Sequence, residues 1–194
     1  MLAREMRWVV ERNGLTHVRV TALPARYHFQ PDLIVPAVEA AVGRARAEGA
    51  VEILIGYADC GTGGQLAAAC ERLEVAMLPG PHCFALYQGL VEAERNADDD
   101  IAVFYITDTL ARQPDAFLWR PLGLDRHPDL LGCYFAHYER AAYLAQSDDL
   151  ALERSARAIA DRLGLSFELR RTGLGDLEPE TLARLALVER REAP

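Results

Sequence analysis

Two cysteines of this 194-residue chain stand in turns that follow short apolar segments. Cys60 comes after segment 51–57, whose sequence VEILIGY is typical of a parallel strand covered on both faces. Cys83 closes the turn PGPHC, which follows the next β-rich segment, 74–78. Because ligands of parallel sheets bind at the carboxyl ends of the strands, we expect both thiols at one sheet edge. Two thiolates there would suit zinc or another thiophilic metal.

The turn around Cys60 also carries groups that could bind an anion. Its sequence, DCGTGG, contains three glycines that let the backbone approach a ligand or form an anion-binding nest. A helix predicted from Gln65 would direct its N-terminus toward this turn and favour the thiolate of Cys60. The alternative is a tight turn with a small core cysteine. The ligand-binding candidates of this turn are Asp59, Gly61, Thr62, Gly63 and Gly64.

Three further side chains are expected at the same edge. His82 stands in the second turn, and His28 follows a strand predicted at 18–23, so each offers an imidazole as a third metal ligand. Asp108 follows a strand predicted at 101–106 and offers a carboxylate to the site. The alternatives are a capping histidine for His82 and an N-capping role for Asp108.

Charge and hydropathy exclude several functional classes. The net charge is −8 and no basic patch is visible, which argues against a nucleic-acid partner. No apolar segment approaches the roughly 20 residues needed to span a bilayer. The first residues predict an amphipathic helix and not a signal peptide. We therefore expect a cytoplasmic protein whose four cysteines stay reduced. The sequence does not indicate an oligomeric state.

The elements that must position these residues alternate along the chain. Besides the strands above, the pattern predicts strands at 140–145 and 166–171 and helices at 31–48, 65–73, 82–94 and 149–163. Alternating strands and helices predict an α/β fold, with a mainly parallel sheet and helices on both faces, as in a Rossmann-like three-layer sandwich. Because no linker or repeat interrupts the pattern, we expect residues 1–194 to form one domain.

The motifs in combination resemble a known family. GYADCGTGG at 56–64, PGPHC at 79–83 and YITDTLARQPD at 105–115 are similar to motifs of the family catalogued as domain of unknown function 1638, in a proteobacterial branch. The resemblance implies that Cys60, Cys83 and His28 are shared site residues, whereas His82 matches only this branch. Relatives lie near corrinoid-dependent methyltransferase systems and folate enzymes, which implies a role in one-carbon metabolism. Relatives also begin with a strand and a Cys-Gly turn, so this chain is expected to start late or to lack that strand.

Three functional hypotheses follow, and they leave open whether the chain is itself an enzyme. The first is a metal-thiolate protein, with zinc, that serves as a methyltransferase component or accessory factor. Its partner would be a small-molecule substrate, a corrinoid protein or a folate-linked enzyme, and the ion would lower the pKa of a bound thiol. The second is a non-catalytic module that binds a small molecule or cofactor through the Gly-rich turn. The third is a metal-free cysteine enzyme with Cys60 as nucleophile and a nearby histidine as base.

Overall fold

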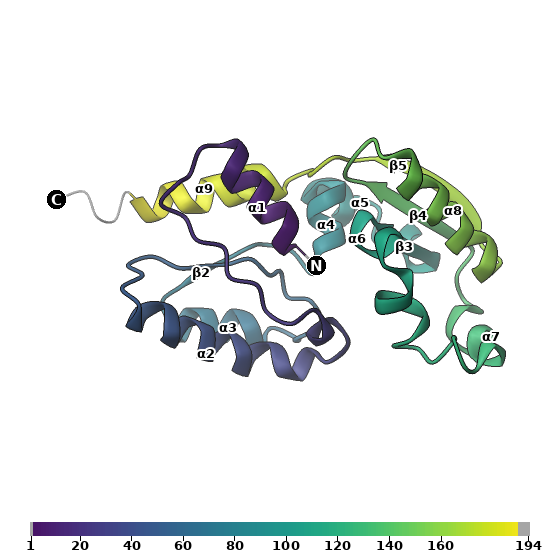
Figure 1. Ribbon diagram of the computed structural model, residues 1–194, viewed down its shortest axis with the longest axis horizontal. Helices are drawn as coiled ribbons and strands as arrows, with labels where there is room; N and C mark the ends of the chain where they lie inside the picture. The colour runs from purple at the N-terminus through teal and green to yellow at the C-terminus, as the bar shows by residue number, and fades with distance from the viewer. Residues whose placement is uncertain (1, 190–194) are drawn as a thin grey trace. The chain divides into compact units, whose positions relative to one another are not determined.

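The computed structural model describes residues 2–189 and divides the chain into two compact units. Unit 1 is formed by the chain up to Leu86 and from Asp176 onward, and unit 2 by Tyr87–Gly175. Each unit combines parallel strands with helices (Figure 1). The predicted α/β class with parallel strands and flanking helices is therefore confirmed, with the strands distributed over two sheets.

Unit 1 is built on a short parallel pair, β1 (Leu54–Ile55) and β2 (Ala76–Met77). Helices α2 (Ile34–Ala47) and α3 (Gln65–Arg72) pack on one another. Figure 1 shows them on one side of the strand pair, with α1 (Ala3–Arg12) and α9 (Leu177–Glu189) on the other. The unit therefore has a strand layer between two helix layers. Its α2–α3 core consists of Ile34, Val38, Val42, Ile55, Leu66 and Cys70.

The strand predicted at 18–23 is absent from the structure. The segment has no regular secondary structure, and within residues 2–189 the backbone of 19–23 makes no backbone hydrogen bond. The alternation of apolar and polar residues there is genuine, but a strand forms only where a neighbour supplies ladder partners. The strands predicted at 51–57 and 74–78 shorten to two-residue ladders for the same reason.

Unit 2 contains a three-stranded parallel sheet in the order β3 (Val103–Thr107), β4 (Arg140–Ala145) and β5 (Ser166–Arg171). The bounds of β4 and β5 agree with the sequence prediction. One face of the sheet packs against α8 (Leu150–Leu163) and α6 (Asp108–Arg112). Asp149 caps α8 by accepting from the Ala151 N–H, and Gly164 ends it with a φ of +73°.

The helix predicted at 82–94 is broken into α4 (Cys83–Gln88) and α5 (Leu90–Arg95). Gly89 separates them with φ +91° and ψ 128°, a conformation that a helix cannot accommodate. A single turn, α7 (Leu131–Phe135), precedes β4. No helix among residues 2–189 is long and apolar enough to cross a membrane. The remaining helical turns are Ala25–Phe29, Pro31–Leu33, Asp99–Ala102, Asp115–Trp119 and Pro128–Leu130.

Candidate functional site

The two cysteine-bearing turns of unit 1 lie side by side at the carboxyl ends of β1 and β2. The N–H of Asp59 donates to the carbonyl of Gly80 at 3.1 Å, and the N–H of Cys60 donates to the carbonyl of Pro81 at 2.8 Å. These bonds continue the parallel pairing of β1 and β2 past the strands themselves. The adjacency that the sheet topology predicts for the two turns is thus present, although the chain contains no CxxC spacing.

The thiols of Cys60 and Cys83 lie within electrostatic range of one another. Cys83 is only 5% exposed, Cys60 is half-buried, and both are free thiols. The backbone N–H of Cys83 lowers the pKa of Cys60 and that of its own thiol, and in both residues burial acts more strongly in the opposite direction. A negative charge on Cys60 raises the pKa of Cys83. The two sulfurs therefore occupy one neighbourhood, fixed by the backbone of two separate turns.

Burial keeps both thiols protonated in the metal-free protein. Desolvation, together with the charge of Cys60, raises the pKa of Cys83 to about 12. Desolvation also raises the pKa of Cys60, against the opposing effect of backbone hydrogen bonds at Ala58 and Cys83. Helix α3 begins at Gln65 as predicted, but the pKa of Cys60 is raised and not lowered, because burial outweighs the groups that favour the thiolate.

Cys60 has a strained backbone. Its φ is +50°, in the left-handed region that a Cβ atom disfavours by about 1–2 kcal/mol. Gly61, Gly63 and Gly64 follow with φ values of +82°, +60° and +84°, which glycine adopts without such a penalty. Strain of this kind persists where surrounding bonds enforce it, and it is frequent at functional sites. Here the bond from the Cys60 N–H to Pro81 enforces it.

The Gly-rich nest holds the carboxylate of Asp59. Oδ1 accepts from the Thr62 hydroxyl at 2.7 Å and from the Gly64 N–H at 2.7 Å, and Oδ2 accepts from the Gly63 N–H at 3.1 Å. The Thr62 bond, followed by the backbone bonds, lowers the pKa of Asp59. The predicted ligand-binding residues of this turn are therefore brought together, but around an anion that the chain itself supplies. An external phosphate would first have to displace it.

Two tyrosines near Cys60 were missed by reasoning from sequence. Burial raises the pKa of Tyr57, and the charges of Cys60 and Tyr27 raise it further, so these groups lie within electrostatic range. The loop carrying Tyr27 reaches the site through Pro31, whose Cγ would lie 3.5 Å from a Cβ on Gly61. A signal was present: Tyr57 ends the apolar segment before the Cys60 turn, and Tyr27 precedes His28.

Neither predicted histidine stands with the thiol pair in a three-ligand group. His82 is exposed, and its Nδ1 accepts from the Ala85 N–H at 3.2 Å, as the capping alternative predicts. His28 is exposed and meets Phe29 edge-on, with ring centroids 5.1 Å apart, while partial desolvation of the ring lowers its pKa. Among residues 2–189, no three His, Cys, Asp or Glu side chains are grouped so that they could hold a metal ion.

Asp108 belongs to unit 2, where it joins β3 to the end of β4. It is 4% exposed, and its carboxylate accepts from the Tyr143 hydroxyl at 2.7 Å, the Gln146 N–H at 3.0 Å and the Ser147 hydroxyl at 2.5 Å. The N-cap of α6 is Thr107 and not Asp108, so the capping alternative for Asp108 is wrong. The donors around Asp108 give it a structural role within its own sheet.

The comparisons with known proteins agree with the motifs. Residues 22–180 match the family model described as protein of unknown function (DUF1638). The chain belongs to this family. The DUF1638 match includes both cysteine-bearing turns, the loop with Tyr27 and the whole of unit 2. No curated protein and no solved structure matches the chain.

Proposed function

We propose that this chain is a metal-thiolate protein in which Cys60 and Cys83 bind a thiophilic ion, with zinc as the first candidate. The observation that carries the proposal is the docking of two turns from separate strands, together with the electrostatic effect of Cys60 on the pKa of Cys83. Zinc coordinates cysteine thiolates in tetrahedral sites, so this pair supplies half of a ligand set. The remaining two positions would be open to water, a substrate thiol or a partner, one more than the single open position of a catalytic zinc site.

The alternatives fit these residues less well. A metal-free nucleophile requires a thiol of depressed pKa, whereas burial raises the pKa of both Cys60 and Cys83. An anion-binding module requires vacant N–H groups, whereas the Asp59 carboxylate accepts hydrogen bonds from Gly63 and Gly64. A cation that displaces the two thiol protons is compatible with both observations.

Within this proposal, the chain works in the cytoplasm in one-carbon metabolism, as a methyltransferase component or an accessory factor of corrinoid-dependent methyl transfer. The support is the family resemblance of the two cysteine turns and the chemistry of the pair. When bound, the ion would lower the pKa of a substrate thiol and so supply a nucleophile. Tyr57 and Tyr27, near Cys60, would line the side from which a substrate approaches.

Metal content tests the ligand set. The protein would be purified under anaerobic, reducing conditions, loaded with Zn²⁺ or Co²⁺, desalted and measured by elemental analysis and by thiolate-to-Co²⁺ charge-transfer absorption. We expect about one ion per chain, lost in Cys60→Ser and in Cys83→Ser, because each removes half of the thiolate donors. Cys133→Ser is the matched control, since Cys133 is exposed and belongs to unit 2. Retention of the ion in the Cys60→Ser/Cys83→Ser variant, or failure to load at all, would refute the proposal.

A separate assay tests methyl transfer. Metal-loaded protein would be mixed with a methylcob(III)alamin and a thiol, and the loss of the methylcorrinoid spectrum followed. Transfer breaks the cobalt–carbon bond, forms a methyl thioether and leaves cob(I)alamin with the electron pair. We expect a rate that depends on Cys60 and not on Cys133. A metal-binding protein without this activity would keep the metal site and exclude direct catalysis.

A further inference from the structure

The segment 18–23 of unit 1 has no regular secondary structure and belongs to neither sheet. Within residues 2–189, none of the backbone groups of 19–23 is hydrogen-bonded to other backbone. Val18 and Val20 are half-buried, whereas Arg19, Thr21 and Ala22 are exposed, so Ala22 is an apolar side chain that a partner could cover. An extended segment with unpaired N–H and C=O groups is a template for pairing with another strand.

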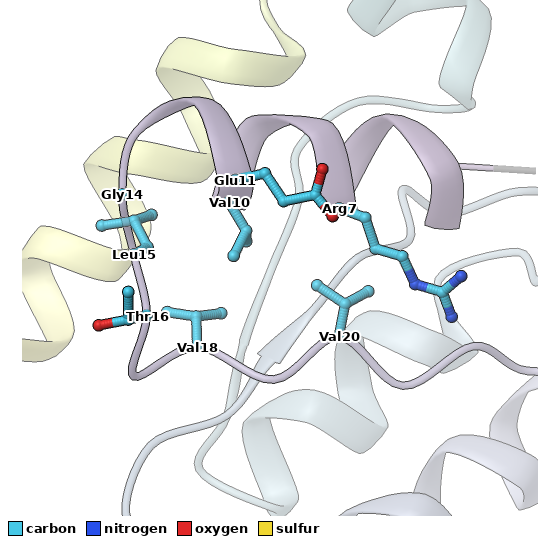
Figure 2. Close-up of a pocket in the computed structure, with 8 residues that line it drawn as sticks. All are labelled: Arg7, Val10, Glu11, Gly14, Leu15, Thr16, Val18 and Val20. Carbon is cyan, nitrogen blue, oxygen red and sulfur yellow. The ribbon is translucent and has the colours of Figure 1, made fainter.

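This segment forms one wall of a groove along α1. Figure 2 shows Val18 and Val20 pointing from the segment toward Val10 of α1. With neighbouring residues they line a pocket of about 290 Å³. Arg7 and Glu11 stand at its α1 side, one helical turn apart. The groove thus has an apolar floor and one charge of each sign on its rim.

We propose that this surface, residues 18–23 with Arg7 and Glu11 of α1, docks a second copy of the chain about a two-fold axis. Antiparallel pairing of the two segments centred on Val20 places Val18 opposite Ala22 of the partner subunit, so the apolar floor continues across the axis. Arg19 then faces Thr21 of the partner subunit, and no like charges are opposed.

Charge complementarity favours a second copy over an unrelated partner. Neither Arg7 nor Glu11 forms an ion pair within the described part of the chain. A two-fold axis runs the two α1 helices antiparallel, so Arg7 faces Glu11 of the partner subunit and the reverse contact forms as well. A second copy of the chain carries the complementary pair of charges by symmetry. The surface uses neither cysteine of the proposed metal site.

Molar mass in solution tests the proposal. The full chain would be measured by sedimentation equilibrium over a concentration series, and we expect reversible formation of a dimer of the 21.5 kDa chain. Arg7→Glu alone or Glu11→Arg alone opposes like charges twice across the axis and should weaken the dimer by about tenfold or more. The double exchange Arg7→Glu/Glu11→Arg should restore it. Circular dichroism checks that each variant is folded.

Proline substitutions supply a matched pair. Successive N–H groups of a strand point to opposite edges, so only one of Thr21 and Ala22 donates across the axis. We expect one of Thr21→Pro and Ala22→Pro to give monomers and the other to leave the dimer intact. The Cys60→Ser/Cys83→Ser variant should remain dimeric, which separates this result from the metal site. A protein that stays monomeric at all concentrations, or a dimer indifferent to these variants, would overturn the proposal.

Discussion

Removal of the Asp59 carboxylate should loosen the turn that holds Cys60. The carboxylate accepts three hydrogen bonds, from the Thr62 hydroxyl and from the N–H groups of Gly63 and Gly64. Because Gly63 and Gly64 are exposed, water replaces part of what is lost, so the cost resembles that of a helix cap. We expect Asp59→Ala to lower the free energy of unfolding by about 1–2 kcal/mol.

The pH dependence separates this effect from a loss of packing. The pKa of Asp59 is lowered in the folded protein, so its contribution is complete above the unfolded pKa, near 3.9. It is lost as the pH falls below that value toward the folded pKa. The stability difference between wild type and Asp59→Ala should therefore be largest near pH 7 and shrink below about pH 4. Urea unfolding, followed by circular dichroism at both pH values, measures it.

A matched control and a second readout complete the experiment. Asp161 is exposed on α8 and forms no ion pair within the described residues, so Asp161→Ala should change stability by less than about 0.5 kcal/mol. Asp59→Ala also vacates the nest, so it should bind inorganic phosphate more tightly than wild type does in isothermal titration. An Asp59→Ala protein as stable as the Asp161→Ala control, or a stability difference that does not shrink at all between pH 5 and pH 3, would refute the assignment of Asp59 as the anion of the nest.

Three other perturbations have definite expected results. Zinc binding should displace a proton from each of Cys60 and Cys83, whose pKa values are raised, so the apparent zinc affinity in chelator competition should fall by about 100-fold per pH unit between pH 8 and 6. A fall of about tenfold per pH unit would mean that only one of the two thiolates binds the ion. Cys60→Gly relieves the φ of +50° that Cys60→Ala retains, so in urea unfolding it should be the more stable of the two by about 1 kcal/mol, and equal stabilities would mean that the turn carries no strain. Asp108→Ala leaves the buried Tyr143 hydroxyl and the Gln146 N–H without their acceptor, so it should destabilise the protein by about 3 kcal/mol or more. The metal content per folded chain should stay at the wild-type value, and loss of the ion without loss of stability would contradict the structural role of Asp108.

The sequence predicted best where local pattern and long-range pairing agree. The strands at 140–145 and 166–171 have the predicted bounds because each is paired along its whole length in the sheet of unit 2. The segment 18–23 has an equally regular alternation, but its backbone finds no ladder partner, and no local pattern contains that information. The break at Gly89 was missed because a glycine inside a helical pattern is often tolerated.

The candidate site shows the same division. The adjacency of Cys60 and Cys83 follows from a topological rule about strand ends, so it could be predicted without any local motif. The raised pKa of Cys83 could not, because desolvation depends on which side chains pack around the thiol. The sequence offered both a metal-ligand and a capping role for His82 and could not decide between them; the bond that its ring accepts from the Ala85 N–H supports the capping role.

The electrostatics of the thiol pair are compatible with the proposed cation and unfavourable to an anion. Burial is the largest cause of the raised pKa of both thiols; the charge of Asp59 adds to it at Cys60, and the charge of Cys60 adds to it at Cys83. An anionic substrate would be opposed by the same charges, whereas a divalent cation would offset them and stabilise both thiolates at once. The Asp59 carboxylate then has two effects, because it fixes the turn through Thr62 and Gly64 and also contributes negative potential near the sulfurs. In the proposed metal site, a cation would therefore meet a Cys60 turn already fixed by its hydrogen bond to Pro81 and would offset the raised pKa of both thiols.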